Sequence, residues 1–357
     1  MRFQKPSFAI LSLATALFCG LIHVNASEVT IETLIELDQR PGNPAIASDG
    51  TIYFSMHPVD SPKYSVMQLV EGEAIPFPSE EASRRFAAVI GIAVDAKDDV
   101  WILDMGGEGK SPQLSCWDGG DHDLKQVIYL PKETLVDNSF AQDFAIDEKR
   151  QVAYIADMGR GDLIGESRPA ILVVDLQTGQ VDRRLEAAPP LQPKEGATMI
   201  VEGRPLAYTN ADGEEHPIEL GLNPIAIDAQ NEWVYFSTIN AGPIYRIRSA
   251  DLANPDSNDD VLMEGIESFA DKPTSDGIAA DGRGQVFITN LEASAISVGD
   301  ANGSRIYAQD ESLIWPDGIA LASDGSLIVT VNQLHKAGLF NGEKEKGAPP
   351  YRIVRIW

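Results

Sequence analysis

The sequence has very little cysteine: 357 residues contain two, Cys19 and Cys116. Cys19 lies in an N-terminal stretch that we expect to be removed, so the mature chain has no partner for a disulfide within itself. Its stability must then come from packing. We expect Cys116 to be a buried, small apolar residue and not a nucleophile.

Basic residues are also scarce, with 28 Lys and Arg against 54 Asp and Glu and a net charge of −26. A field of this sign repels nucleic acid and anionic lipid. We therefore expect a small-molecule partner that is neutral or cationic. The sequence does not indicate an oligomeric state.

Long apolar runs are missing after the first 26 residues, so no later segment approaches the ~20 apolar residues that a membrane span needs. Residues 1–26 themselves have the pattern of a secretory signal. Arg2 and Lys5 precede the apolar run FAILSLATALFCGLI, and Ala26 stands at the expected cleavage point. We expect a secreted protein, periplasmic or extracellular, whose residues 27–357 form a single domain.

Familiar nucleotide and hydrolase motifs are absent as well. The stretch GGEGKS at Gly106–Ser111 lacks the spacing and the following helix of a phosphate loop. No Ser-His-Asp order or dinucleotide fingerprint stands in a fitting context.

What the sequence does contain is a repeat. Six segments share one plan, an apolar strand, a polar turn and a second β-rich strand: NPAIASDGTIYFSMH from Asn43, IGIAVDAKDDVWILDMG from Ile90, AQDFAIDEKRQVAYIADMG from Ala141, NPIAIDAQNEWVYFSTIN from Asn223, SDGIAADGRGQVFITN from Ser275 and PDGIALASDGSLIVTVNQ from Pro316. Aligned alanines in the first strands, from Ala45 to Ala320, are 48, 52, 81, 53 and 41 residues apart. Four spacings fit the ~40–50 residue period of propeller repeats, and the long one indicates an insertion at about 187–220.

Further strand candidates follow each hairpin, which gives the four strands of a propeller blade. The sequence therefore predicts an all-β, six-bladed β-propeller. The stretch TIETLIEL near the N-terminus has no hairpin partner, and YRIVRIW ends the chain in the sixth blade. We predict that these two strands pair and close the ring, with the N-terminal strand outermost.

The stretch Ser275–Asn290 holds two Asp-Gly pairs with different predicted roles. Asp281-Gly282 stands where every repeat has its hairpin turn, so we assign it to the turn. Asp276 precedes the innermost strand, at the mouth of the central channel. Since antiparallel geometry places the start of strand one beside the end of strand two, polar residues from all blades should meet at this mouth. Those at the starts of first strands are Asn43, Gln142, Asp143, Asn223, Asp276 and Asp317, and those at the ends of second strands are His57, Asp104, Asp157, Asn240, Asn290, Glu292, Asn332, Gln333 and His335.

Convergent polar groups are typical of a ligand site, although each Asp or Asn could instead satisfy backbone groups of its own loop. Oxygen ligands from Asp276, Asp317, Asn223 and Asn43 would suit Ca²⁺. Zinc is disfavoured because no Cys or His cluster has ligand spacing. Alternatively, His57 or His335 could move a proton beside an aspartate.

The sequence resembles a bacterial member of the major royal jelly protein and Yellow family. The resemblance is carried by RPGNPAIASDGTIYFSMHP at Arg40, LDMGGEGKSPQLSCWD at Leu103, AQDFAIDEKRQVAYIADMG at Ala141, SDGIAADGRGQVFITNLEASAI at Ser275, WPDGIALASDGSLIVTVNQLH at Trp315 and PPYRIVRI at Pro349. It implies a secreted six-bladed propeller. Some insect relatives are linked to dopachrome conversion and some bind biogenic amines in the central cavity, but they carry cysteines that this chain lacks.

A more distant resemblance is to the gluconolactonase and senescence-marker propellers, which are metal-dependent lactonases. It implies that Asn223 and Asp276 stand at metal-binding positions and that Gln142-Asp143 resembles a substrate-contacting Asn-Asp pair. Those enzymes place a metal-binding Glu in an early Glu-Gly-Pro context, where this chain has Gly42-Asn43-Pro44. The loss of one carboxylate should weaken a divalent site.

Three hypotheses follow. In the first, a Yellow-like protein binds, and in its stronger form converts, a small aromatic or amine-bearing molecule. Here Asp276, Asp317 and Glu292 meet a cation, and the candidate catalytic residues are His57, His335 and Asp143. In the second, a Ca²⁺-dependent hydrolase opens lactones. In the third, a noncatalytic propeller uses the same face for protein contacts. We expect the 187–220 insertion to border the mouth.

Overall fold

The computed structural model describes residues 1, 29–107, 109–194, 196–210 and 212–357. Apart from Met1, the predicted signal sequence therefore lies outside the described residues, and export of the chain stays a prediction. All strands predicted from the six repeats lie within the described residues.

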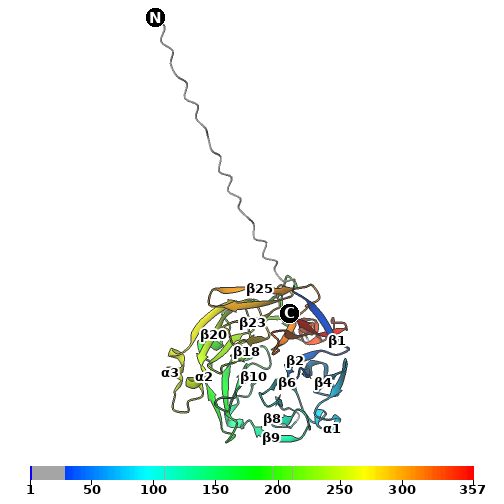
Figure 1. Cartoon of the computed structure of the whole chain (residues 1–357), viewed down its shortest axis with the longest axis vertical. Coiled ribbons are helices and arrows are strands. Elements are labelled where there is room, and N and C mark those ends of the chain that lie inside the picture. The colour runs from blue at the N-terminus through cyan, green and yellow to red at the C-terminus, as the bar shows by residue number, and fades with distance from the viewer. Residues whose placement is uncertain (2–28, 108, 195, 211) are drawn as a thin grey trace.

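Six four-stranded antiparallel sheets surround one axis (Figure 1), which confirms the six-bladed propeller. Blade one contains β2 (Pro41–Ile46), β3 (Ile52–Met56), β4 (Val66–Val70) and β5 (Glu73–Pro76), and blade two contains β6 (Val89–Val94), β7 (Asp99–Asp104), β8 (Gln113–Asp118) and β9 (Leu124–Tyr129). Blade three contains β10 (Ala141–Asp147), β11 (Val152–Asp157), β12 (Ala170–Asp175) and β13 (Val181–Arg184), and blade four contains β18 (Leu222–Ile227), β19 (Trp233–Thr238), β20 (Gly242–Arg248) and β21 (Glu267–Lys272). Blade five contains β22 (Ile278–Ala280), β23 (Val286–Asn290), β24 (Ala295–Asp300) and β25 (Gly303–Gln309).

The sixth blade closes the ring as predicted. Its order is β1 (Ile31–Leu37), β28 (Tyr351–Ile356), β27 (Leu327–Val331) and β26 (Pro316–Leu321), with the N-terminal strand outermost. The pairing runs from Ile31 opposite Ile356 to Leu37 opposite Tyr351. The two ends of the folded domain therefore hold one sheet together.

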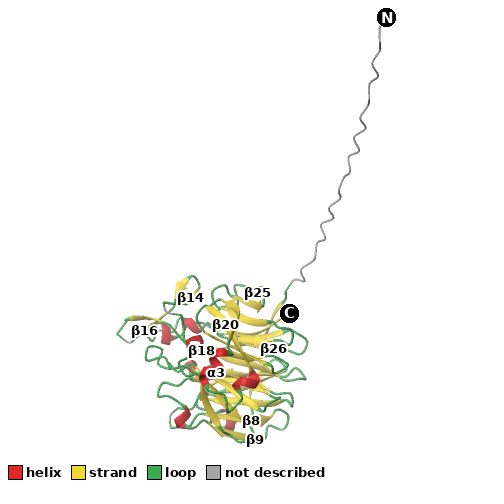
Figure 2. Cartoon of the chain, turned by 90° about the vertical axis from the view of Figure 1, so that its left-hand side faces the viewer, coloured by secondary structure: helices red, strands yellow, loops and turns green. Residues whose placement is uncertain are grey.

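The insertion between blades three and four adds two small hairpins, β14 (Ile200–Val201) with β15 (Arg204–Pro205), and β16 (Ala207–Thr209) with β17 (Glu215–Pro217). Figure 2 shows β14 and β16 standing out from one face of the ring. Short helices lie in the connections: α1 (Glu80–Ser83), α2 (Ser249–Leu252) and α3 (Asp259–Glu264), and the 3₁₀ turns Pro58–Asp60, Lys132–Thr134, Pro189–Leu191, Leu334–Lys336 and Gly338–Phe340.

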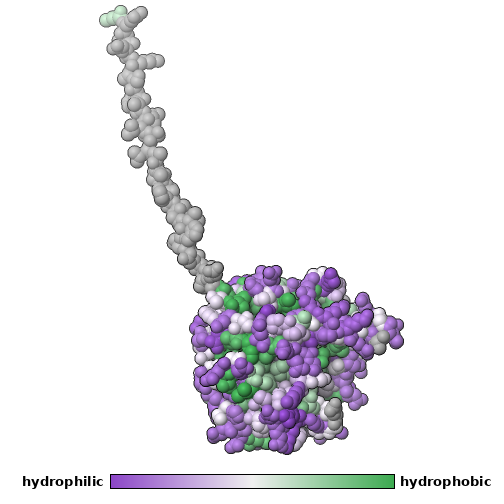
Figure 3. All heavy atoms as spheres, turned by 90° about the vertical axis from the view of Figure 1, so that its right-hand side faces the viewer, coloured by the Kyte–Doolittle hydropathy of each residue, from purple (hydrophilic) through white to green (hydrophobic). Residues whose placement is uncertain are grey.

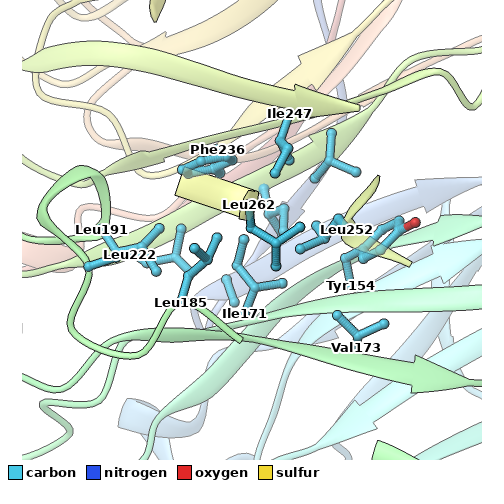
Figure 4. Close-up of a cluster of buried hydrophobic side chains, with 14 of the residues drawn as sticks. Tyr154, Ile171, Val173, Leu185, Leu191, Leu222, Phe236, Ile247, Leu252 and Leu262 are labelled. Carbon is cyan, nitrogen blue, oxygen red and sulfur yellow. The ribbon is translucent and has the colours of Figure 1, made fainter. Parts of the chain in front are cut away.

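The hydrophobic core lies between neighbouring blades, because each sheet buries apolar residues on both faces. Figure 4 shows the contact between blades three and four, where Tyr154 and Ile171 face Phe236 and Ile247. Leu262 of α3 belongs to the same cluster. Cys116 is buried in the neighbouring cluster, and burial raises the pKa of its thiol to about 12. The thiol is therefore protonated, as expected of a packing residue.

The innermost strands carry an irregularity where each one begins. In five blades the pairing register between the first and second strands shifts at this point. The residues without a pairing partner at the shift include Asn43, Gly91, Gln142, Asn223 and Asp317. In blade five the hydroxyl of Thr289 accepts hydrogen bonds from the N–H groups of Asp276 and Gly277, at 3.1 and 2.9 Å. A bulge re-aims a side chain that regular pairing would hold in the sheet. These bulges position the polar residues around the axis.

Glycines allow the innermost strands to approach one another closely. A Cβ on Gly277 would lie 2.4 Å from the carbonyl oxygen of Asp317, and one on Gly318 would lie 2.6 Å from Cα of Asn43. The first Asp-Gly pair thus combines an axial carboxylate with a close backbone contact. The second pair is a turn, in which the carboxylate of Asp281 accepts from the N–H groups of Arg283 and Gln285.

The outer surface is mainly hydrophilic on the face shown in Figure 3. Within the described residues, no helix is both long enough and apolar enough to cross a membrane.

We predict that Gly318→Ala lowers the free energy of unfolding by about 1–3 kcal/mol, because the new methyl group overpacks a backbone contact at the axis. This corresponds to a fall of a few degrees in the melting temperature. The matched control is Gly242→Ala, where an added Cβ would meet nothing within 4 Å. Equal melting temperatures for the two variants would contradict the close axial contact.

Candidate functional site

A cavity of about 400 Å³ opens at the end of the channel where the innermost strands begin. Its polar floor is formed by Gln142, Asn223, Asp276 and Asp317, with His57 at one side. Its walls are apolar and include Ile90, Phe140, Met158, Ile239 and Trp315. An apolar chamber with a few convergent polar groups is the usual form of a small-molecule site.

Two segments outside the blades complete the walls. The insertion contributes Met199, Leu206, Tyr208, Ile218 and Leu220, and the segment after β27 contributes Leu334, Leu339 and Phe340. The hydroxyl of Thr209 donates to the carbonyl of Phe340 at 3.4 Å, which joins the two segments. The insertion therefore borders the mouth and covers part of the cavity.

Three of the four floor residues form one hydrogen-bonded chain. The amide of Gln142 donates to the carbonyl and side-chain oxygens of Asn223, and the amide of Asn223 donates to Oδ1 of Asp276 at 2.7 Å. The indole of Trp315 donates to Oδ2 of the same carboxylate at 2.8 Å. Both oxygens of Asp276 are thus held by N–H donors.

Asp143 and Asn43 lie on the axis at the far side of this floor. They line a second cavity of about 240 Å³, whose walls are the small and apolar residues of the six innermost strands. Asp143 accepts from the amide of Asn43 at 3.0 Å and from the N–H groups of Phe144 and Ile225 at 3.0 and 3.3 Å. The polar belt therefore separates two spaces along the channel.

Burial raises the pKa values of all three axial carboxyls. Burial alone is the largest cause for Asp143, whose pKa rises to about 7 although three N–H donors oppose the rise. Asp317 has its pKa raised well above the usual range by burial and then by the charge of Asp276. The pKa of Asp276 is also raised by burial, but Trp315, Asn223 and the Lys272 ammonium oppose the rise.

Lys272 is a buried cation behind the floor. Its Nζ donates to the carbonyls of Ile239, Asn240 and Pro273 at 3.3, 3.0 and 3.1 Å. Burial lowers its pKa to about 7, while Asp276 and Glu292 raise it. Three carbonyl acceptors match the three donors of an ammonium group, so we assign Lys272 as charged. That charge favours the ionised form of Asp276.

The two histidines differ in position. His57 lines the cavity, and burial lowers its pKa to about 4, so the ring is neutral at pH 7. Its Nδ1 accepts from the N–H of Val59 at 3.2 Å, which places the proton on Nε2. His335 stacks on Trp315 with ring centroids 5.4 Å apart and pairs with Glu202 of the insertion at 3.0 Å. It stands behind the cavity wall and does not line the cavity.

The remaining predicted residues also do not line the cavity. Most of them instead hold nearby loops: Asp104 accepts from the N–H groups of Ala87, Ala88 and Gly106; Asp157 from Phe140 and Gly159 and from Arg183; Asn240 contacts Leu220 and Ile218; Asn290 contacts Ala293 and Ser297; Glu292 accepts from Thr274; and Gln333 contacts Ala348. Asn332 differs, because its amide donates to the axial carboxylate of Asp317 as well as to the carbonyl of Pro41. For the residues that hold loops, the physical reason is that a short polar side chain at a strand end can reach unpaired loop amides before it reaches the axis.

Sequence reasoning missed Trp315, Lys272 and the apolar walls. Trp315 directly precedes the Pro316-Asp317 start of β26, and it has φ 56°, a left-handed conformation that is rare for a bulky residue. The sequence signal that could have identified Trp315 as a site residue is its position next to the axial Asp317 in the repeat. The insertion was expected to border the mouth, but it has no repeat pattern, so the sequence did not indicate which of its side chains form the walls.

The donor set for a cation consists of oxygen atoms only, from Asp143, Asp276, Asp317 and neighbouring amides, and this is the chemistry that Ca²⁺ prefers. Among the residues that the structure describes, however, no three His, Cys, Asp or Glu side chains gather closely enough to hold a metal ion. The side-chain amides of Asn43 and Asn223 also direct N–H groups at the carboxylates. The arrangement as described does not fit a bound divalent cation.

Fold and site together define a six-bladed propeller with a partly covered axial cavity. Residues 87–354 match the family model described as "Major royal jelly protein", so the chain belongs to the major royal jelly protein family. No curated protein matches the sequence.

Solved structures with similar folds come from several kinds of protein. A gluconolactonase from Xanthomonas campestris is 12% identical, with a TM-score of 0.56, and the match covers 92% of this chain and 90% of that one. A calcium-binding protein, regucalcin, from Agrobacterium tumefaciens is 14% identical, with a TM-score of 0.56 and coverage of 92% and 94%. A PQQ-bound aldose sugar dehydrogenase from Streptomyces coelicolor is 12% identical, with a TM-score of 0.53 and coverage of 92% and 99%. At these identities the likeness concerns the fold.

We predict that Asp317→Asn makes the stability of the protein less sensitive to pH. The raised pKa of Asp317 means that the folded state holds its proton more tightly than the unfolded state, where an aspartate has a pKa of about 3.9. This contribution to stability is complete below that pH and is lost as the pH rises through the folded value. The melting temperature of the wild type should therefore fall more between pH 5 and 8 than that of the variant.

The control for this experiment is Asp256→Asn, at an exposed position in the loop between α2 and α3. It should follow the wild type. Parallel pH profiles for all three proteins would contradict a buried, protonated Asp317.

Proposed function

We propose that this chain binds a small aromatic molecule in the axial cavity and isomerises it by proton transfer between Asp276 and Asp317. The observation that carries the proposal is the pair of carboxyl groups on the floor of an apolar cavity, with Asp317 buried and Asp276 half-buried. Their surroundings differ in how strongly they favour the ionised form. Such a difference is how enzymes assign one carboxyl as base and another as acid.

Asp276 is the base. The indole of Trp315, the amide of Asn223 and the charge of Lys272 all favour its ionised form. Asp317 is the acid, because burial and the nearby charge of Asp276 keep its proton in place. Neutral His57 supplies a further N–H donor from Nε2 at the side of the cavity.

The proposed reaction needs no oxidant or reductant. The carboxylate of Asp276 removes a proton from a ring carbon of a quinone-type tautomer, and the electron pair of that C–H bond moves into the ring. Asp317 then adds its proton to the carbonyl oxygen at the other end of the conjugated system. Exchange of a proton from Asp276 back to Asp317 restores the enzyme. Tautomerisation of dopachrome, the reaction linked to some Yellow relatives, is likewise a proton transfer without net oxidation or reduction.

The apolar walls favour an aromatic ring as the bound group, with 400 Å³ available to it. An amine would meet Asp276, the floor carboxylate that is most readily ionised. Glu292 accepts from Thr274 instead and is not on the floor. We place this activity outside the cytoplasm, in keeping with the predicted signal sequence.

A direct test is the decay of dopachrome, followed by the loss of its visible absorbance. We expect the protein to accelerate the decay and Asp276→Asn to reduce kcat/KM by at least about 100-fold, the lower range for loss of a general base. Asp256→Asn is the control of equal charge change and should keep the wild-type rate. A rate equal to the buffer alone for the wild type would refute the conversion, and retention of activity in Asp276→Asn would refute the assigned base.

The second candidate is a Ca²⁺-dependent lactone hydrolase, favoured by the type of donor alone, since Asp143, Asp276 and Asp317 offer carboxylate oxygens along the channel. The melting temperature of chelator-treated protein, measured with and without Ca²⁺, distinguishes the isomerase from the hydrolase. A ligand at a hundred times its dissociation constant stabilises a protein by about 2.7 kcal/mol. Because the amides already direct N–H groups at the carboxylates, we expect millimolar Ca²⁺ to leave the melting temperature unchanged.

An upward shift of several degrees with Ca²⁺ that disappears in Asp276→Asn would overturn this expectation and support the hydrolase. If neither Ca²⁺ nor an aromatic ligand has any effect, the noncatalytic interaction propeller becomes the best account of the chain.

A further inference from the structure

A second hollow, the basic groove, lies beside the covered cavity between the insertion and the segment after β27. It has a volume of about 790 Å³. Its charged lining residues are Arg204, Lys336, Lys344, Lys346, Glu202 and Glu215, with His335 at its inner end. Cations thus outnumber carboxylates among the described residues of the groove, in a chain whose net charge is −26.

The carboxylate of Glu202 is already engaged, by His335 at 3.0 Å and by Lys336 at 3.2 Å. Arg204, Lys344 and Lys346 are exposed, and within the described part of the chain none of them forms an ion pair with a carboxylate. These three cations therefore remain available to a ligand.

The sequence Glu343-Lys344-Glu345-Lys346 contributes to the excess of positive charge in the groove. Both lysines line the groove, while Glu345 turns away and pairs with Arg40 at 2.7 Å. Arg40 is buried and also pairs with Asp60 at 2.6 Å, so this anchor is firmly held. The local fold thus removes a negative charge from the groove and leaves the positive charges in it.

The basic groove adjoins the apolar cavity across two shared side chains. Leu206 of the insertion and Phe340 of the covering segment line both spaces. The shortest path from a ring in the cavity to the groove therefore runs past Leu206 and Phe340.

We propose that the basic groove binds an anionic substituent, a carboxylate, sulfate or phosphate, of the aromatic molecule whose ring lies in the cavity. The inference rests on the proposed function only in taking the cavity as an aromatic site. It adds the substrate class: an aromatic anion instead of the neutral or cationic ligand that the overall charge suggests. Surface ion pairs of this kind contribute modestly each and weaken with salt.

A matched pair of fluorescent probes tests this proposal, 8-anilinonaphthalene-1-sulfonate and the neutral N-phenyl-1-naphthylamine. They share an aromatic skeleton and differ in the sulfonate. We expect the sulfonate probe to bind about tenfold more tightly in low salt, on the order of two surface ion pairs. The double variant Lys344→Gln/Lys346→Gln should remove most of that preference, and so should 0.5 M NaCl, while binding of the neutral probe stays constant.

Two controls locate the effect. The variant Lys97→Gln/Lys132→Gln removes the same charge at exposed positions outside the groove and should keep the preference. Leu206→Trp adds bulk at a half-buried residue that lines both the cavity and the groove, and it should weaken the binding of both probes.

The outcomes separate the two proposals. Tight binding of both probes with no preference for the sulfonate overturns the groove and leaves the aromatic cavity intact. Absence of binding by the neutral probe, or binding that Leu206→Trp does not weaken, overturns the cavity and with it the proposed function. If Lys97→Gln/Lys132→Gln reduces the preference for the sulfonate probe as much as Lys344→Gln/Lys346→Gln does, the preference comes from general charge attraction. That outcome also overturns the proposed anion site in the groove.

Discussion

The close approach of six innermost strands around one axis is the constraint on which the rest of the structure depends. Where Gly277 and Gly318 meet the neighbouring strands, there is no room for a side chain on the backbone. The strands can then be regular only beyond that point, and the register shifts at their starts direct side chains such as Asn223 and Asp317 into the channel. Packing at the axis and the polar floor are thus two results of one geometry.

That geometry also determines the electrostatics. Three carboxyl groups are brought to the axis, away from bulk solvent, and burial is the first cause of each raised pKa. The surroundings of these carboxyl groups are unequal. Asp276 has two N–H donors and a buried lysine nearby, whereas Asp317 has one side-chain donor, Asn332, and faces the charge of Asp276. One carboxyl is favoured as an ion and another as an acid, although the residues are chemically identical.

Much of the fold could be predicted from the sequence because each blade repeats the same strand and turn pattern, and the closing strand was predicted because TIETLIEL had no hairpin partner. The axial residues were also found, since their position in the repeat places them at the channel. Residues at the ends of the second strands were harder to place. Whether Asp104 or Asn240 reaches the axis or turns back to loop amides depends on loop backbone conformation, which the repeat does not encode. The cavity walls depend on the unrepeated insertion and on Trp315, whose left-handed backbone is a feature of tertiary packing.

The contrast between the net charge and the mouth of the cavity shows why composition alone is a weak guide to a ligand. A field from 54 acidic residues acts on a molecule in solution, but salt screens it beyond about 10 Å. Inside the mouth the groups within contact distance decide, and there the floor carboxyls are partly neutralised by burial while Lys344 and Lys346 stand at the groove. An anionic ligand would be repelled at long range and held at short range. Recognition of this kind favours specificity over a fast association rate. The long-range repulsion slows the association of every anion, and only an anion that also carries an aromatic ring for the cavity is retained.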